Sequence, residues 1–199
     1  MNEFGLWFMM GMEHILSLGA YDHILFVVLL VLASSLKEWK TLLILVTAFT
    51  LGHSISLVLS VNDYITVNSP LIEWMIALTI LLSAVYQVIN FKKAEHSKKS
   101  FLYIIITLFG LVHGLGFSIL LKDLLGHEEN VILPLLYFNL GIEFGQIIIV
   151  GIVLVFSLLL IKIVKWPFHF YKLILTCCIT LIALKISVER FLELLQSHS

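Results

Sequence analysis

The sequence predicts an all-α protein that crosses a membrane several times as a polytopic helix bundle. Of its 199 residues 60% are hydrophobic and only 13% are charged, whereas soluble domains carry about 25% charged residues. The mean hydropathy is +1.07, and long apolar runs recur along the chain. We therefore expect one transmembrane domain over residues 1–199, in contact with the lipid bilayer.

Six apolar runs bounded by charged or turn residues are the expected transmembrane helices, because each crossing needs about 20 apolar residues. They cover residues 23–36, 40–61, 70–91, 100–122, 132–164 and 168–190. The first run is short, and the sequence LGA separates it from a further helical segment at residues 4–17. We expect this N-terminal segment to be a half-helix or a re-entrant piece.

The distribution of lysine predicts the orientation in the membrane. The loops at 61–69 and 122–130 hold one lysine between them. Nine of the other ten lysines gather near the first, third and fifth junctions, at Lys37, Lys40, Lys92, Lys93, Lys98, Lys99, Lys162, Lys165 and Lys172, and Lys185 lies in the last span. Because cytoplasmic loops are rich in Lys and Arg, both termini are predicted to lie outside. The net charge of −1 and the lack of a basic patch argue against a nucleic-acid partner.

Ionisable side chains within or beside the spans are the candidate functional residues, since each costs about 2.5–3.5 kcal/mol at the centre of a bilayer. The stretch MEHILSLGAYDHILF contains His14, Asp22 and His23, and the second and fourth spans contain His53 and His113. At 1.5 Å per residue, these last two lie roughly 12 Å from the predicted outer ends of their spans. The histidines and the aspartate are thus expected at similar depth.

Two polar stripes accompany these residues, because positions three or four residues apart share a helix face. The stripes are Thr47, Thr50 and Ser54 in the second span and Asn139, Glu143 and Gln146 in the fifth. A further carboxylate, Glu73, lies at the start of the third span on the predicted outer side.

Imidazole and carboxylate groups gathered at one depth are typical of a site for a divalent transition metal. We predict metal ligands at His14, Asp22, His23, His53, His113 and Glu143, supported by Glu73, Asn139, Gln146, Ser54 and Thr50. A single histidine inside a membrane is more often a hydrogen-bonded packing residue. Clustering of several histidines and carboxylates favours a site. The adjacent Cys177 and Cys178 point in different directions on a helix and are expected to be packing residues.

Four motifs carry a resemblance to a known family. They are GMEHILSLGAYDHILF at 11–26, TAFTLGHSISL at 47–57, GLVHGLGFS at 110–118 and FNLGIEFGQ at 138–146. With Glu73 they are similar to the HupE/UreJ family of small membrane proteins, in its second, shorter subgroup. This resemblance implies a multi-pass protein of the bacterial inner (cytoplasmic) membrane, usually described as a nickel or cobalt permease or as an accessory protein for hydrogenase and urease maturation.

The resemblance also assigns residues. His14, Asp22, His23, His53 and His113 match the family's histidine and aspartate positions, and Asn139 and Glu143 match its motif in the fifth span. Two departures leave the ion open among nickel, cobalt and zinc. Seven residues separate His14 from Asp22 where the family's typical motif has five, and HGLGF keeps one histidine where the hydrogenase-linked branch has a pair.

Three functions fit these observations. The first is a permease in which His14, Asp22 and His23 capture the ion from outside and His53, His113 and Glu143 form a deeper site. The second is an intramembrane metal-dependent hydrolase, with Glu143 or Glu73 as the base; no H-E-x-x-H motif supports it. The third is a metal-binding accessory protein that does not transport. The almost wholly apolar inner halves of the last three spans argue against simple permeation.

Overall fold

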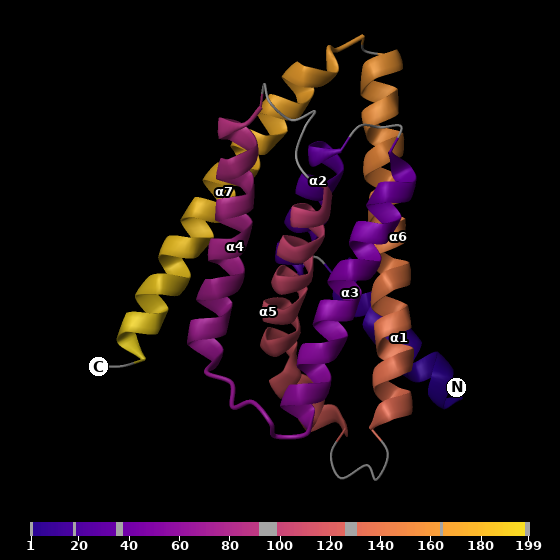
Figure 1. Ribbon diagram of the computed structural model, residues 1–199, viewed down its shortest axis with the longest axis vertical. Coiled ribbons are helices and arrows are strands. Elements are labelled where there is room, and N and C mark those ends of the chain that lie inside the picture. Colours follow the sequence, from indigo (N-terminus) through magenta and orange to yellow (C-terminus); the bar gives the residue numbers. More distant parts are fainter. Residues whose placement is uncertain are drawn as a thin grey trace.

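The computed structural model describes residues 2–17, 19–34, 38–91, 99–125, 131–163 and 165–197, and all regular secondary structure in these ranges is α-helical (Figure 1). This confirms the predicted fold class. The helices are α1 (Glu3–Leu16), α2 (Tyr21–Ala33), α3 (Trp39–Val61), α4 (Ser69–Ile89), α5 (Lys99–Leu125), α6 (Ile132–Lys162) and α7 (Phe168–Gln196).

The helices α3 to α7 are the five that are long and apolar enough to cross a membrane. They correspond to the second to sixth predicted spans, and α3, α4 and α6 agree with the predicted bounds within two residues. The start of α4 follows its sequence closely. Asn68 caps the helix by accepting a hydrogen bond from the Leu71 backbone N–H, and Pro70 occupies its first turn. The helix α7 continues six residues beyond its predicted end, to Gln196.

The first predicted span corresponds to α2, which is too short to cross the bilayer alone. The helices α1 and α2 have 14 and 13 residues, or roughly 20 Å each, against a hydrocarbon thickness of about 30 Å. They meet at an angle of 72° and form either one broken span or a re-entrant loop. The half-helix expected at residues 4–17 is α1.

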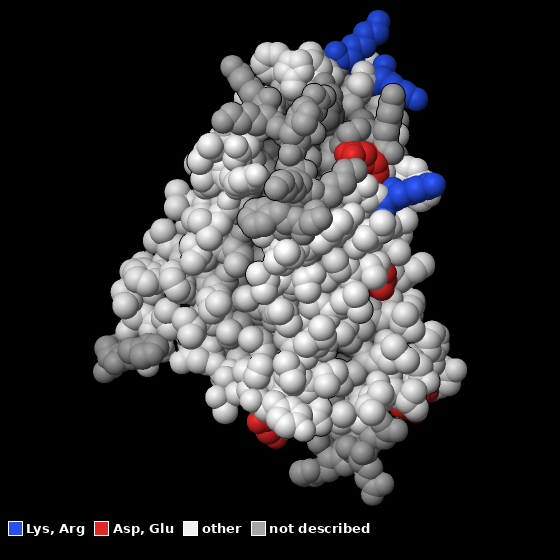
Figure 2. All heavy atoms as spheres, viewed as in Figure 1, with Lys and Arg blue, Asp and Glu red and all other residues white. Residues whose placement is uncertain are grey.

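The long helices alternate in direction, so that the junctions near lysine residues lie at one end of the bundle. The α2–α3 and α6–α7 junctions are at the upper end of Figure 1, and the chain termini lie toward the lower end. The face shown in Figure 2 is largely uncharged, and its Lys and Arg side chains gather near the same upper end. Placement of the termini outside stays a prediction. Lys37, Lys92, Lys93 and Lys98 lie outside the described residues.

Reciprocal glycines bring α3 and α5 into close contact. A Cβ atom on Gly110 would lie 2.2 Å from the Phe49 carbonyl oxygen, and one on Gly52 would lie 2.2 Å from the Thr107 carbonyl oxygen. Real Cβ atoms do not approach so closely. The pair therefore requires glycine on both helices, and it fixes the spacing of the backbones on which His53 and His113 stand.

The α1–α6 contact is built in the same way. A Cβ on Gly11 would lie 2.0 Å from the Phe138 carbonyl oxygen, and one on Gly141 would lie 2.1 Å from that of Phe8. This crossing holds α1, and with it His14, against the middle of the bundle.

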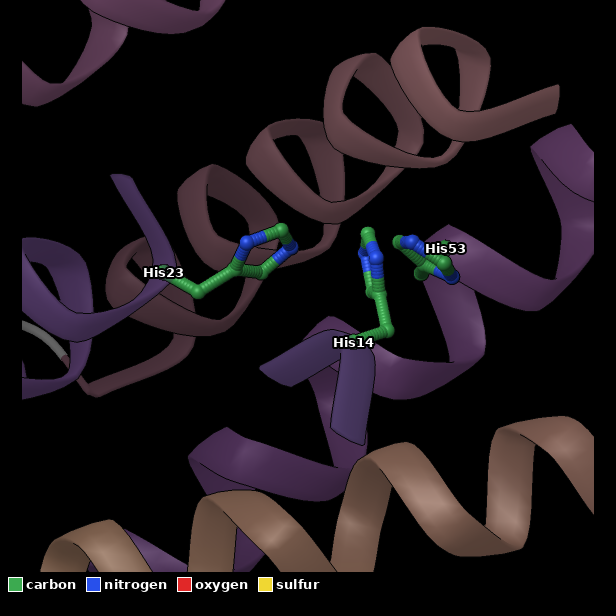
Figure 3. Close-up of side chains that lie close together, drawn as sticks. All are labelled: His14, His23 and His53. Carbon is green, nitrogen blue, oxygen red and sulfur yellow. The ribbon is translucent and has the colours of Figure 1, made fainter. Parts of the chain in front are cut away.

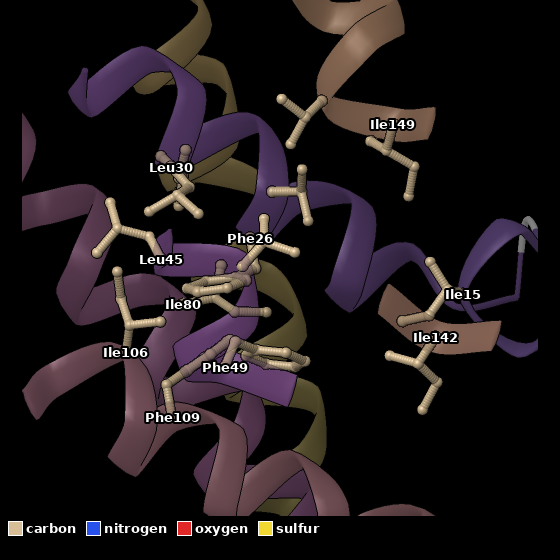
Figure 4. Packing of buried hydrophobic residues seen from close by; sticks show 14 of the residues in the cluster. Ile15, Phe26, Leu30, Leu45, Phe49, Ile80, Ile106, Phe109, Ile142 and Ile149 are labelled. Carbon is tan, nitrogen blue, oxygen red and sulfur yellow. The ribbon is translucent and has the colours of Figure 1, made fainter. Parts of the chain in front are cut away.

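An apolar core surrounds these crossings on the lysine side of the histidines (Figure 4). Phe26 of α2 stacks on Phe109 of α5 with ring centroids 4.0 Å apart, and Phe49 of α3 contacts both rings. Phe49 also packs against the rings of His53 and His113. The polar site is thus bounded by closely packed aromatic rings.

Candidate metal centre

The break between α1 and α2 places His14 beside His23. His14 lies in the last turn of α1 and His23 in the first turn of α2, and their ring centroids are 5.0 Å apart. A straight helix would separate residues nine positions apart by roughly 13 Å along its axis. The bend between α1 and α2 therefore creates this contact. A straight transmembrane helix over the same residues would keep His14 and His23 apart.

His53 completes a group of three imidazoles. It projects from the middle of α3 toward the rings of His14 and His23, at centroid distances of 6.4 Å from each (Figure 3). One ring nitrogen of each histidine lies within 4.8 Å of the others. We call His14, His23 and His53 the three-histidine group. His53 is fully buried.

A second group of donor atoms shares His23. It consists of Asp22, His23 and His113, whose donor atoms also lie within 4.8 Å of one another. Asp22 Oδ1 is 3.0 Å from His23 Nδ1, and Asp22 Oδ2 is 3.5 Å from His113 Nε2. We call these residues the aspartate group. Asp22 Oδ1 also accepts a hydrogen bond of 2.9 Å from the His23 backbone N–H, which fixes the carboxylate at the start of α2.

Most of these imidazole nitrogens have no hydrogen-bond partner among the described residues. His14 Nε2, His23 Nε2 and both ring nitrogens of His53 and of His113 are buried without a hydrogen bond among the described residues. Two of these rings have a polar neighbour, since Asp22 Oδ2 lies 3.5 Å from His113 Nε2 and the Asn139 side chain lies next to His53. Buried polar atoms are paired in the large majority of cases, so these nitrogens are candidate donor atoms for a ligand.

A cavity of about 240 Å³ opens beside the two groups. His14, Asp22, His23 and His113 line it, whereas His53 does not. Ile76, Ala77 and Ile80 of α4 and Ala183 and Ile186 of α7 line it as well. Tyr21, which is exposed, and Glu73 and Arg190, which are partly exposed, also border the cavity and mark its mouth.

Arg190 lines this cavity but was not predicted to be a site residue. Its Nη1 lies 2.9 Å from Glu73 Oε2 and 2.7 Å from Glu193 Oε2. The sequence signal that could have placed it there is that positions 183, 186 and 190 share one face of α7. Lys185 and Glu189 of the same helix also pair, at 3.6 Å.

Glu73 lies at the cavity as expected from its position, but its carboxylate does not contact an imidazole. Its Oε1 accepts a hydrogen bond of 3.1 Å from Ser69, and its Oε2 faces Arg190. Glu73 is thus part of an ion pair at the mouth rather than a residue that orients a histidine.

Glu143, a predicted ligand, is not in either donor group of the described residues. Its Oε1 accepts a hydrogen bond of 2.5 Å from Thr47 Oγ1. The physical reason is its height on α6. Asn139 lies next to His53, and Glu143 is one turn, about 6 Å, further along the helix. The carboxylate therefore meets α3 beyond the imidazoles.

The two polar stripes face each other across the α3–α6 interface. Thr50 Oγ1 donates a hydrogen bond of 3.0 Å to Gln146 Oε1, and Thr47 Oγ1 donates one to Glu143. We call these two hydrogen bonds, together with Asn139, the polar ladder. Asn139 donates its Nδ2 to the Leu135 carbonyl oxygen and leaves its buried Oδ1 unpaired, as is Gln146 Nε2. Ser54, predicted to support a ligand, donates to the Thr50 carbonyl oxygen of its own helix.

The fold and the site together define a class: a polytopic helical membrane protein with a buried histidine and aspartate cluster beside a cavity. The chain belongs to the HupE/UreJ family, because the model of that family, described as HupE / UreJ protein, matches residues 1–190. Searches of curated proteins and of solved structures found no match. The family match confirms the resemblance drawn from the four motifs.

Proposed function

We propose that this protein binds a divalent transition-metal ion at the three-histidine group and carries it across the membrane. The observation that supports this most directly is the set of unpaired nitrogens. His14 Nε2 and His23 Nε2 are buried and have no hydrogen-bond partner among the described residues. His53, which lies next to Asn139, supplies the third imidazole, and one donor atom from each of the three residues lies within 4.8 Å of the other two. Imidazole suits nickel, cobalt and zinc alike. The HupE/UreJ family, generally nickel- or cobalt-transporter-like, favours nickel or cobalt as the cargo.

In this proposal Asp22 orients a ligand. Its bond to His23 Nδ1 directs the opposite nitrogen, Nε2, toward His14 and His53. Histidines that bind metals commonly donate their other ring N–H to a carboxylate in this way, which fixes the tautomer and raises the basicity of the ligand. Asp22 can serve as a ligand itself only in the aspartate group, where its bond to His23 would have to open.

The aspartate group supports a role as the first position of the ion. Asp22, His23 and His113 line the cavity, whereas the three-histidine group includes His53, which does not. The shared residue, His23, belongs to both groups. An ion received from the cavity would therefore pass to the deeper group by exchanging Asp22 and His113 for His14 and His53 while His23 stays coordinated.

The polar ladder between α3 and α6 supports movement beyond the three-histidine group. It consists of Asn139, which lies next to His53, and the Thr50–Gln146 and Thr47–Glu143 hydrogen bonds. On α6, Glu143 and Gln146 both lie further than Asn139 toward the lysine end of the bundle. These oxygens and amides are the polar groups that an ion or its water would need along an otherwise apolar interface.

A metal-dependent hydrolase is a second candidate that one observation favours. Three histidine ligands with an open coordination position facing a cavity are typical of catalytic metal sites. The predicted bases support it less, because Glu143 bonds Thr47 and Glu73 faces Arg190. A non-transporting accessory protein would have the same ligands as the permease and differs from it only in transport.

The first experiment measures metal content. The protein is purified in detergent, dialysed against nickel(II) and analysed for bound metal, together with His53→Ala, His14→Ala and the control His169→Ala, whose side chain is exposed at the start of α7. We expect about one ion in the wild type and in the control, and loss in both other variants. Retention of the ion by His53→Ala would contradict the proposed ligands.

Uptake separates the candidates. Proteoliposomes containing the wild type should accumulate nickel, and those containing His53→Ala should not. Binding without accumulation would reject the permease in favour of the accessory protein or the hydrolase.

A further inference from the structure

The cavity beside the metal centre is larger than a coordinated ion requires. Three protein ligands leave at most three further positions of an octahedral ion, and three water molecules occupy about 90 Å³. The cavity measures about 240 Å³. It therefore offers room for an organic group between the imidazoles and the mouth.

One wall of the cavity contains no donor atoms in its side chains. Ile76, Ala77 and Ile80 of α4 face it together with Ala183 and Ile186 of α7. A hydrated ion would lose hydrogen bonds against such a wall. The carbon skeleton of a small organic molecule would instead gain from contact with it.

A guanidinium group stands at the mouth of what is proposed to be a cation site. Arg190 lines the same cavity as His14, His23 and His113. Its planar donors match a carboxylate, and two carboxylates, those of Glu73 and Glu193, already pair with it. Arg190 is therefore a carboxylate-binding group at the mouth of the cavity.

We propose that the cavity takes the metal as a complex with a small carboxylate-bearing chelator, with the metal at the imidazoles and a carboxylate oxygen that is not bound to the metal at Arg190. This inference rests on the proposed function and names its cargo more closely. The chelator fills the coordination positions that the protein leaves open, and its carbon atoms contact Ile76, Ile80 and Ala183.

Arg190 can accept this carboxylate by exchanging a partner. Its ion pair with Glu73 is partly exposed, with side-chain exposures of 34% and 40%, and exposed ion pairs contribute little to stability. Glu193 remains bound to Arg190 from the following turn of α7. A carboxylate from the ligand can thus replace that of Glu73 at small cost.

The test compares nickel binding at equal free nickel concentration in three conditions: nickel alone, nickel with L-histidine or citrate, and nickel with histamine. Histamine keeps the imidazole and amine of histidine and lacks the carboxylate. Equilibrium dialysis with radioactive nickel measures the bound metal, and labelled histidine measures the bound chelator. For the wild type we expect at least fivefold tighter binding with histidine or citrate than with nickel alone, one chelator per ion, and no gain with histamine.

Variants of Arg190 locate the effect. Arg190→Gln should abolish the gain given by the carboxylate chelators, and Arg190→Lys, which keeps the charge, should restore part of it. Lys122→Gln is the matched control, since Lys122 pairs with Asp63 and does not line the cavity. It should behave as the wild type. Thermal unfolding of each variant identifies any loss of folded protein.

The outcomes are distinguishable. Wild-type binding that depends on free nickel alone, whichever chelator is present, would overturn this inference and leave the proposed function standing. A gain that survives in Arg190→Gln would also overturn it. No nickel bound by the wild type in any of the three conditions would reject the proposed function itself.

Discussion

Replacement of Asp22 by asparagine tests which of the two donor groups holds the ion. In the structure Asp22 Oδ1 accepts hydrogen bonds from both the backbone N–H and the ring Nδ1 of His23. Asparagine keeps one oxygen acceptor at the start of α2 and removes the negative charge. The substitution therefore preserves the local fold while it weakens the bond that orients His23.

The expected magnitude follows from the role of Asp22. Hydrogen bonds to a charged partner are roughly twice as strong as neutral ones, and removal of a group that orients a metal ligand typically lowers metal affinity 10- to 100-fold. The variant should thus lose about 1.4–2.8 kcal/mol of binding free energy. If Asp22 were itself a ligand in the ground state, Asp22→Asn would lose more affinity than His53→Ala, because His53 is not in the aspartate group.

The assay is competition for nickel against a coloured chelator, with Asp63→Asn as the control. Asp63 is an exposed aspartate that follows α3 and pairs with Lys122. Wild-type affinity in Asp22→Asn, alongside lost affinity in His53→Ala, would refute the reasoning that a charged carboxylate fixes the His23 ring. Lost affinity in Asp22→Asn, alongside wild-type affinity in His53→Ala, would move the stable ion position to the aspartate group.

Two further predictions follow from the packing and the polar ladder. Gly110→Ala places a Cβ against the Phe49 carbonyl oxygen and must separate α3 from α5 by about 1 Å, so thermal unfolding should show a loss of about 1–3 kcal/mol. Gly151→Ala, where nothing lies within 4 Å, should show none. Glu143→Gln should retain bound nickel and lose most uptake into proteoliposomes. Loss of nickel binding in this variant would show that Glu143 is a ligand.

The long helices were predictable because their apolar length alone determines them. Residues 40–61 and 132–164 were predicted as spans, and α3 and α6 begin and end within two residues of these bounds. The first span was not predictable in the same way. Hydropathy does not distinguish a straight crossing from a broken one, and the break near Gly19 depends on how α1 packs against α6 through Gly11.

The sequence predicted which residues lie at the candidate site better than it predicted which of them contact one another. Spacing by three and four residues places Asn139 and Glu143 on one face of a helix, and that face does meet α3. It does not give the height at which two helices cross. Asn139 consequently lies next to His53, whereas Glu143 bonds Thr47 one turn away. Arg190 was missed for a related reason: a charge near a helix end is compatible with both the bulk solvent and a cavity.

The unpaired imidazole nitrogens are significant in this fold because close helix packing keeps the rings from moving apart. A buried polar atom without a partner costs about 1–3 kcal/mol, and His14 Nε2 and His23 Nε2 are two such atoms among the described residues. The rings do not separate easily to relieve this cost, because Gly110 and Gly141 hold the helices that carry the histidines at backbone contact. A ligand that bonds to these nitrogens only in the folded protein stabilises the folded protein. In the proposed function a metal ion is such a ligand, because one ion bonds to three imidazoles at once, and the close packing that leaves the nitrogens unpaired also holds them in place for it.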